Sequence, residues 1–318
     1  MTNEVSVERS LLACQPAAAS EYRAPLLAIW SALAAVYLIW GSTYLAIRYA
    51  VETMPPFLMA ASRFIVSGGF LYLLRRGLGD PPPKSVEWRN AAIMGVFLLV
   101  GGNGGVVWAE QFVTSSLAAL LVATVPLWMV LIDGLRPAGR RPNFTAVVGI
   151  LIGFGAVVLL IGSVAGSTDT MSLVGSAALI LASVSWAIGS LYGRGANLPS
   201  SQLLGTAMEM LAGGVALLLL ASANGEWSRL DFAAVSARSA LALVYLTVIG
   251  SCGFVAYVWL LRVAPTPLVA TYAYVNPLVA VVLGYFLAHE PITLRTLAAG
   301  ALIIGSVALV SVPKRKVT

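Results

Sequence analysis

LVATYAYVNPLVAVV, from Leu268 to Val282, is an apolar stretch that decides the fold. It carries two tyrosines, an asparagine and a proline where a lipid-facing helix would have leucine. An upstream stretch, LAALLVATVPLWMV from Leu117 to Val130, matches it at a constant shift that places Pro126 on Pro277. The two stretches indicate that one unit of the chain is duplicated.

The composition excludes an ordinary soluble domain. Hydrophobic residues make up 59% of the chain and charged residues 10%, whereas soluble domains have about 45–50% apolar and about 25% charged residues. The net charge of +6 would suggest an acidic partner in a soluble chain. Here the basic residues lie in short loops beside apolar runs, where membrane topology explains them. We therefore expect a lipid bilayer as partner and no nucleic acid.

Ten apolar runs are long enough to cross a bilayer core about 30 Å thick, which takes roughly 17–25 helical residues. The runs are Leu26–Ile47, Phe57–Leu74, Ala91–Ala109, Val113–Ile132, Phe144–Val164, Met171–Gly193, Leu203–Ser222, Ser239–Leu261, Pro267–Ala288 and Thr296–Val312. They predict an all-α polytopic membrane protein with ten transmembrane helices.

The loop charges predict the orientation. With the N-terminus in the cytoplasm, most Lys and Arg residues fall inside, and Arg48, Arg229, Arg238 and Arg295 remain outside, as the positive-inside rule requires. We expect an inner (plasma) membrane protein with both termini cytoplasmic. Residues 1–24 would be a polar cytoplasmic tail and residues 314–318 a basic cytoplasmic C-terminus.

The duplication extends over the whole membrane region. Related shifts place Trp40 on Trp186 and Trp108 on Trp259, which predicts a first repeat at residues 25–164 and a second at 165–313. Each repeat holds five helices, an odd number, so the second must enter the membrane from the opposite face. Inverted repeats of this kind in secondary transporters place a substrate site near the midplane and support alternating access.

Four motifs resemble the EamA family of the drug/metabolite transporter superfamily, which includes the YedA-like inner-membrane transporters of bacteria. They are Trp40-Gly41-Ser42-Thr43-Tyr44, Arg63-Phe64, Ala273-Tyr274-Val275-Asn276-Pro277 and His289-Glu290-Pro291-Ile292-Thr293. The resemblance implies ten helices in two inverted five-helix repeats that move small metabolites or drugs, usually outward. It names no substrate. The glutamate motif is present in the second half only, because Gly139 stands at the repeat position of Glu290.

Aromatic and amide groups are the candidate substrate surface. An aromatic wall buries an apolar part of a solute while hydroxyl and amide groups fix a polar part. Aromatic residues near helix ends are also ordinary membrane-interface anchors. The candidate substrate-binding residues are Tyr37, Trp40, Tyr44, Arg63, Asn103, Tyr257, Tyr272, Tyr274 and Asn276.

Arg63 and Glu209 are charges within apolar runs, where each costs about 2.5–3.5 kcal/mol on insertion scales. Arg63 could anchor a substrate carboxylate, or it could extend toward the membrane surface. Glu209 could carry a proton or serve as a structural acceptor. Their predicted levels differ by about 12 Å, which argues against a direct salt bridge.

Pro126 and Pro277 fall within predicted helices, where proline removes a backbone donor. The pair predicts two hinges, with static kinks as the alternative. Glu290 could cap the last helix or latch the outer gate. The chain has one histidine and two cysteines, too few for the usual metal sites. We expect no cofactor and no metal.

These observations favour a secondary transporter that exports small amphipathic metabolites or drug-like compounds by alternating access, with proton coupling left open. A facilitative carrier or a lipid-headgroup flippase on the same fold is the alternative. No HExxH pair supports an intramembrane enzyme, and no GxxxxGK[ST] loop supports ATP hydrolysis. Whether the protein acts alone or as a homodimer stays open.

Overall fold

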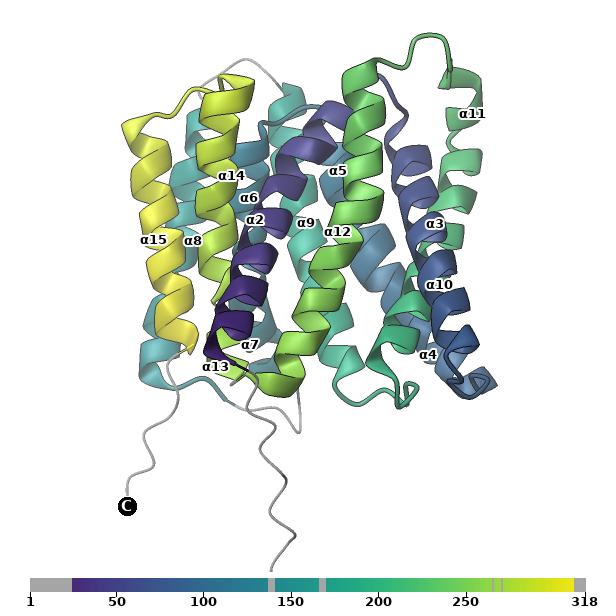
Figure 1. Ribbon diagram of the computed structural model, residues 1–318. Coiled ribbons are helices and arrows are strands. Elements are labelled where there is room, and N and C mark those ends of the chain that lie inside the picture. The colour runs from purple at the N-terminus through teal and green to yellow at the C-terminus, as the bar shows by residue number, and fades with distance from the viewer. Residues whose placement is uncertain (1–24, 137–140, 166–169, 265, 270, 312–318) are drawn as a thin grey trace, which may run out of the picture.

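The protein is a bundle of long helices. A computed structural model describes residues 25–136, 141–165, 170–264, 266–269 and 271–311, and within them every regular element is a helix. The first helix begins and the last helix ends at the same end of the bundle (Figure 1). The predicted tail at 1–24 and the basic segment at 314–318 lie outside the described residues.

Ten membrane-crossing segments correspond to the ten predicted runs. Eight are long and apolar enough by themselves, and the shorter apolar helices Tyr272–Ala288 and Leu294–Val310 complete the set among the described residues. The elements are α2 (Leu26–Ala50), α3 (Pro56–Gly77), α4 (Ser85–Gly95), η1 (Val96–Gly104), α5 (Gly105–Ala109), α6 (Ser115–Val122), α7 (Val125–Leu135), α8 (Phe144–Ala165), α9 (Thr170–Gly193), α10 (Gln202–Ala223), α11 (Glu226–Arg229), α12 (Ala237–Val263), α13 (Thr266–Val269), α14 (Tyr272–Ala288) and α15 (Leu294–Ser311).

Most predicted ends differ from the observed ones by a few residues. The largest difference is in the third segment, which begins at Ser85 and not at Ala91. Glu87 and Arg89 ended the apolar run, but they occupy the first turns of α4. There the Glu87 carboxylate accepts a hydrogen bond from the Lys84 backbone N–H at 2.7 Å, which stabilises a helix start.

The fourth and ninth segments are broken, although the sequence predicted continuous helices. α6 ends at Val122 and α7 begins at Val125, with Pro126 in the first turn of α7. Proline is tolerated there because the first helical N–H groups have no intrahelical partner. In the ninth segment α13 ends at Val269 and α14 begins at Tyr272, and Pro277 lies inside α14.

The third segment also departs from a regular α-helix. It winds as a π-helix over η1, from Val96 to Gly104, and this turn carries Asn103. The eighth segment, its repeat counterpart, is an uninterrupted α-helix over Ala237–Val263. Because π-helical turns are frequent at functional sites, the position of Asn103 in η1 makes it a candidate for a functional role.

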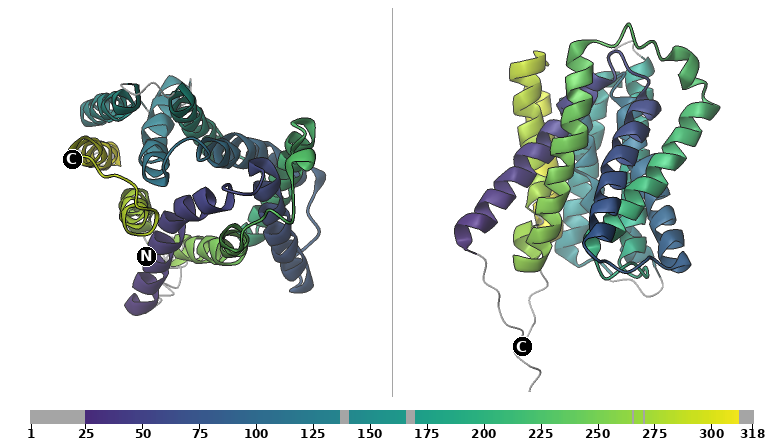
Figure 2. Two further views of the ribbon diagram at one scale, coloured as in Figure 1. Left: turned by 90° about the horizontal axis from the view of Figure 1, so that it is seen from above. Right: turned by 45° about the vertical axis from the view of Figure 1, so that its right-hand side comes forward.

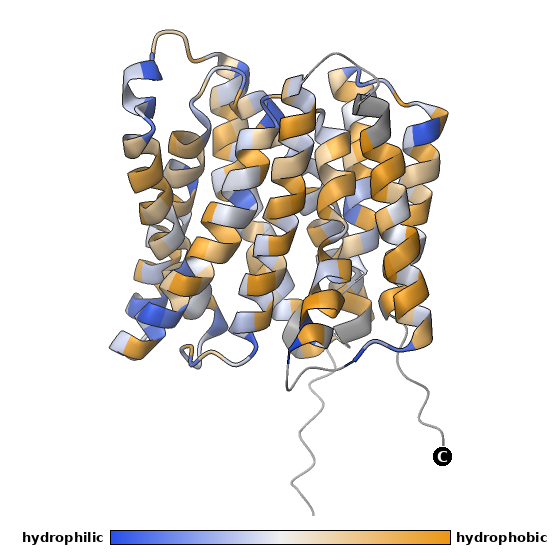
Figure 3. Cartoon of the chain, turned by 180° about the vertical axis from the view of Figure 1, so that it is seen from behind, coloured by the Kyte–Doolittle hydropathy of each residue, from blue (hydrophilic) through white to orange (hydrophobic). Residues whose placement is uncertain are grey.

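The outward faces of the bundle are apolar. Large hydrophobic side chains such as Leu38, Phe70, Leu151, Leu181 and Leu219 are exposed on five different helices. Apolar residues dominate the middle of the bundle, while hydrophilic residues gather toward its two ends (Figure 3). A surface of this kind matches the hydrocarbon core of a bilayer and its two interfaces.

The two predicted repeats interleave. α2 packs along α12 and α8 along α15, as the view down the bundle shows (Figure 2), and η1 packs on α9. A Cβ added at Gly253 would meet Trp40 at 2.9 Å, and one added at Gly102 would meet Trp186 at 2.7 Å. Each half thus places its tryptophan against the aligned glycine of the other half. This exchange supports the predicted inverted duplication at 25–164 and 165–313, which stays a prediction.

Candidate substrate cavity

A cavity of about 640 Å³ lies between the two halves. Helices from both halves contribute to its wall, and its size is typical of small-molecule sites, which span about 300–1,000 Å³. Arg194, Leu198 and Pro199 from the α9–α10 loop line one end. The cavity therefore extends to the end of the bundle where α2 begins (Figure 1).

Aromatic rings form one wall of the cavity. The Trp40 ring of α2 lies 5.3 Å from Phe254, 5.0 Å from Tyr257 and 5.1 Å from Tyr272, measured between centroids. The Tyr257 and Tyr272 rings are 5.6 Å apart. These spacings fall in the range at which aromatic rings attract one another. The wall is therefore stable by itself and offers an apolar surface with two hydroxyl groups.

Among the described residues that line the cavity, three buried side-chain polar atoms have no hydrogen-bond partner. They are Arg63 Nη1, Asn103 Oδ1 and Asn276 Oδ1, from α3, η1 and α14. Leaving a buried polar group unpaired costs about 1–3 kcal/mol, and such groups in native proteins usually have a partner. One guanidinium donor and two amide acceptors are thus available to a bound solute.

Most of the predicted substrate-binding residues line this cavity: Trp40, Tyr44, Arg63, Asn103, Tyr257, Tyr272 and Asn276. Their common location agrees with the prediction that they form one surface. Their role in binding a solute stays a prediction.

Tyr37 and Tyr274 are not among the described residues that line the cavity, and their role in binding a solute stays a prediction. The Tyr37 hydroxyl bonds with the Thr271 hydroxyl, and the Tyr274 hydroxyl donates to the Val307 carbonyl of α15 at 3.4 Å. Tyr274 is two residues from Tyr272, whereas residues sharing a helix face are three or four apart. Tyr272 and Asn276 have that spacing, which leaves Tyr274 on the opposite side of α14.

Both predicted intramembrane charges line the cavity, Arg63 from α3 and Glu209 from α10. Among the described residues no ion pair joins them. The Arg63 guanidinium carbon lies 4.3 Å from the ring centroid of Phe64, so a ring face supports the charge that lacks a carboxylate partner. Each charge is free to act on a solute separately.

Both prolines also line the cavity, but their helical positions differ. Pro126 occupies the first turn of α7, where its missing N–H removes no helical hydrogen bond. Pro277 lies inside α14, where the carbonyl of Ala273 loses its donor. The predicted hinge function therefore has a clearer physical basis at Pro277 than at Pro126.

Glu290 caps a helix of the other half at the end of the bundle away from the α9–α10 loop. Its carboxylate accepts hydrogen bonds from the backbone N–H groups of Ser115 at 2.8 Å and Ser116 at 3.0 Å, and from both hydroxyls. These serines begin α6, so Glu290 caps α6. The first predicted alternative, that Glu290 caps the last helix, was wrong. No described residue of 107–118 or 284–295 lines the cavity, so the cavity stops short of these residues, and we call this region with its Glu290 cap the seal.

Gly284 makes the Glu290 cap sterically feasible. A Cβ at this position would collide with the Glu290 carboxylate and with the Ser116 hydroxyl. α14 therefore approaches α6 closely at the seal, and any larger residue would force the cap apart.

Two residues of interest were missed in the sequence. Trp186 of α9 lines the cavity, and its alignment with Trp40 could have identified it. Glu110 directly follows α5 and is 0% exposed. It directly follows the apolar run that ends at Ala109, and the run itself carries no signal that this acid is buried.

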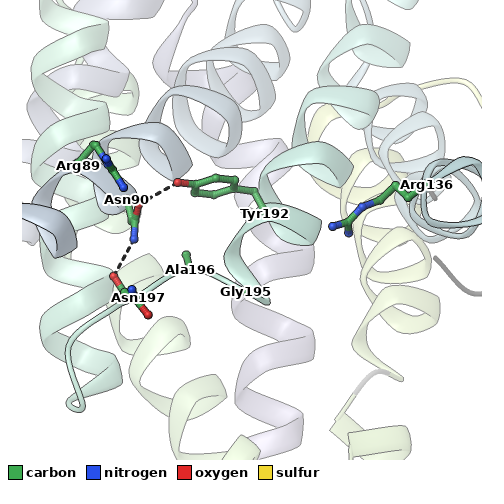
Figure 4. A pocket seen from close by; sticks show the side chains of 7 residues that line it. All are labelled: Arg89, Asn90, Arg136, Tyr192, Gly195, Ala196 and Asn197. Atoms are coloured by element: carbon green, nitrogen blue, oxygen red, sulfur yellow. Dashed lines mark hydrogen bonds between the residues drawn. The ribbon is translucent and has the colours of Figure 1, made fainter. Parts of the chain in front are cut away.

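A smaller hollow of about 360 Å³ lies beside the mouth of the cavity and is lined by Arg89, Asn90 and Arg136, among others (Figure 4). Asn90 donates to the Asn197 carbonyl at 3.0 Å, and the Tyr192 hydroxyl donates to Asn90 Oδ1 at 2.8 Å. These two bonds tie α4 to α9 and to the α9–α10 loop, so they hold the mouth in place.

Comparison with known families agrees with this architecture. Residues 26–162 and 173–312 each match the EamA-like transporter family. The chain belongs to this family. The two matches cover the two halves of the EamA-like bundle and the cavity residues in both.

Similar proteins span the same length as this EamA-like chain. It is 40% identical over 293 residues to the inner membrane transporter YedA of Escherichia coli (strain K12), which covers 91% of this chain and 92% of the relative. It is 24% identical to the transporter YvbV of Bacillus subtilis (strain 168), covering 88% and 90%. A solved crystal structure shares the fold with a TM-score of 0.60 at 22% identity, covering 91% and 97%.

Proposed function

We propose that this EamA-like protein is a secondary transporter of the inner membrane that exports small amphipathic metabolites or drug-like compounds by alternating access. The observation that carries the proposal is the cavity, where unpaired polar atoms of Arg63, Asn103 and Asn276 stand beside an aromatic wall. The inner-membrane location rests on the apolar spans and on the similarity to YedA, which is named an inner membrane transporter.

The unpaired atoms favour a particular kind of solute. A guanidinium donor at Arg63 suits an anionic or strongly accepting group, and the amide oxygens of Asn103 and Asn276 suit N–H or O–H donors. The Trp40 wall suits an apolar or aromatic part. A molecule with an acid-like group, a donor group and an apolar body would satisfy all of them.

The shape of the cavity supports loading from the cytoplasm. It extends to the end where α2 begins and is sealed at the end that carries Glu290. The loop charges predict that the α2 end is cytoplasmic. A reporter domain fused to the C-terminus should therefore be active on the cytoplasmic side. Activity on the outer side would reverse the orientation and the proposed direction of loading.

The transport test uses proteoliposomes that contain the purified full-length protein. A mixture of amphipathic metabolites is offered, and saturable counterflow of a solute identifies a cargo and distinguishes a carrier from a channel. Counterflow that falls in Asn276→Ala but is kept in an outward-facing control, Leu278→Ala, which is 52% exposed, would support the cavity as the site. Scrambling of a labelled lipid without counterflow would favour a flippase instead.

Glu209 is the proposed coupling residue for a proton. It lines the cavity from α10, where a carboxylate could exchange a proton with cavity water as the cavity opens to either side. Glu209→Gln should still transport, but an imposed pH gradient should no longer drive accumulation of the solute. The matched control is Thr206→Val, one turn away on the same wall. An unchanged pH response in Glu209→Gln would leave a facilitative carrier as the better description.

A further inference from the structure

Glu110 is a buried acid that the transport cavity does not explain. The residue is 0% exposed, and both carboxylate oxygens are buried without a hydrogen-bond partner. It follows the last residue of α5 and does not line the cavity. An ionised carboxylate in that situation would carry a large desolvation penalty, whereas a protonated one is much less costly.

The charged and titratable groups that face Glu110 come from three other parts of the bundle. The Arg48 side chain of α2 donates to the backbone carbonyl of Glu110, and the charge and backbone of Arg48 both act to lower the pKa of the Glu110 carboxyl. Arg63 of α3 acts on Glu110 by its charge, yet its Nη1 is buried and unpaired. Glu290 and Tyr44 also interact electrostatically with Glu110. Arg63 Nη1 and both Glu110 carboxylate oxygens are therefore buried and unpaired, although the two groups interact through their charges.

Glu110 and Glu290 are neighbouring carboxylates in opposite circumstances. The Glu290 carboxylate accepts four hydrogen bonds from Ser115 and Ser116, whereas the two carboxylate oxygens of Glu110 are buried without a partner. Burial raises the pKa of Glu110 and the Glu290 charge raises it further, while Arg48 and Arg63 oppose the rise. Two acids whose surroundings differ in this way commonly have different protonation states and different roles.

We propose that Glu110 is a proton-binding site within the outer seal. It holds a proton while the seal is closed. When the seal opens, the proton passes to external water and the carboxylate pairs with an arginine, Arg63 or Arg48. The inference rests on the proposed alternating access, because it assumes that this end of the bundle opens in a second state. It assigns to Glu110 the control of that opening, separate from the coupling role proposed for Glu209.

The proposal fixes the direction of the pH effect. Because burial raises the pKa of Glu110, the stabilisation of the closed seal is complete below the pKa of a free glutamate. It is lost as the pH rises through the raised pKa. Since one proton is released, the ratio of open to closed protein should rise by at most about tenfold per pH unit within that window.

Thiol labelling measures the opening. Ala119 is 0% exposed and lines the cavity, so a cysteine there reacts from the outer side only when the seal opens. The reporter chain carries Ala119→Cys with Cys14→Ser and Cys252→Ser, in sealed right-side-out vesicles with a membrane-impermeant maleimide. Phe232→Cys, at an 81% exposed position, corrects for the pH dependence of the thiol itself.

The corrected labelling of Ala119→Cys should rise severalfold from mildly acidic to alkaline pH. Glu110→Gln, which mimics the protonated acid, should label slowly at every pH, and Glu209→Gln should keep the rise. The proposal would be overturned if the corrected labelling of the reporter chain did not depend on pH. It would also be overturned if that labelling still rose with pH in Glu110→Gln. Because no substrate is used, these results are independent of whether a cargo for the cavity is found.

Infrared spectroscopy provides a measurement on the unaltered protein. A protonated carboxylic acid has a carbonyl band separate from the amide bands, and free carboxylates lack it at neutral pH. We expect such a band in the wild type and in Glu209→Gln, with loss on raising the pH. Its absence from both would contradict a protonated Glu110, even if Glu110→Gln failed to fold.

Discussion

The fourth and ninth segments are aligned copies that have diverged in two respects. Each carries a proline at the same repeat position, Pro126 or Pro277. The fourth segment breaks just before its proline, whereas the ninth breaks at the start of α14 and keeps Pro277 inside the helix. In the fourth segment the chain breaks between α6 and α7, so Pro126 interrupts no helix. In the ninth segment Pro277 lies within α14 and removes a helical hydrogen bond.

The copies also differ in the polarity of their cavity face. Tyr272 and Asn276 line the cavity from the ninth segment, and the aligned residues of the fourth are Leu121 and Val125. Leu121 is fully buried in the protein core. At these aligned positions the ninth segment thus supplies hydrogen-bonding groups and the fourth supplies apolar packing, while Arg63 and Asn103 add polar groups from other helices of the first half. The two aligned segments therefore differ in the surface that each presents to the cavity.

The largest expected difference between the copies concerns the prolines. Pro277→Ala restores a backbone donor within α14, and an interior proline weakens a helix by about 3 kcal/mol. If α14 must bend for transport, the exchange rate should fall by up to about a hundredfold. Pro126→Ala should change the rate by less than about threefold, since a first-turn proline interrupts no helical bond.

Counterflow rates at saturating solute compare the two variants. Equal slowing by Pro126→Ala and Pro277→Ala would restore the symmetric pair of hinges that the sequence predicted. No slowing by either would make both prolines static features.

The second comparison concerns the polar face. Asn276→Ala should lower transport efficiency by about tenfold, because a hydrogen bond from solute to a buried amide is worth roughly 0.5–1.5 kcal/mol, and more if the partner is charged. Val125→Ala, its aligned counterpart in the same cavity, should stay within about threefold. Both changes are measured as the ratio of the kcat/KM of the variant to that of the wild type, with the identified cargo. A larger loss in Val125→Ala would place the solute against the first half.

Much of the fold could be predicted because a membrane-spanning helix requires a long run of apolar residues, which the sequence shows directly. The breaks could not. Ala123 and Thr124 interrupt the fourth segment within a continuous apolar run, and Thr124 is almost fully buried. Its hydroxyl donates to the Leu121 carbonyl at 2.6 Å, so this buried hydroxyl and the carbonyl at the end of α6 pair with each other. Composition alone does not distinguish this turn from a helix.

The candidate site was predicted where residue type and helical spacing agreed. Trp40, Tyr272 and Asn276 are polar or aromatic groups in mid-membrane, and they line one cavity. Glu110 was missed because its significance depends on burial by residues far away in sequence, among them Arg48 and Glu290. The apolar run ends before such a residue, and only the tertiary structure shows that the residue is buried.

The smallest expected effect separates Tyr272 from Tyr274, two residues apart on α14. Tyr274→Phe removes a long hydrogen bond of 3.4 Å to Val307, away from the cavity, so transport should change by less than about twofold, as for a weak bond. Tyr272→Phe removes a hydroxyl that bonds Tyr257 within the aromatic wall, and we expect about a fivefold loss. Measured with one cargo under the same conditions, the order of the two losses is decisive. If Tyr274→Phe cost more, the cavity-facing side of α14 would have to rotate during transport. The ninth segment would then both bind and turn, and the division of roles between the copies would fail.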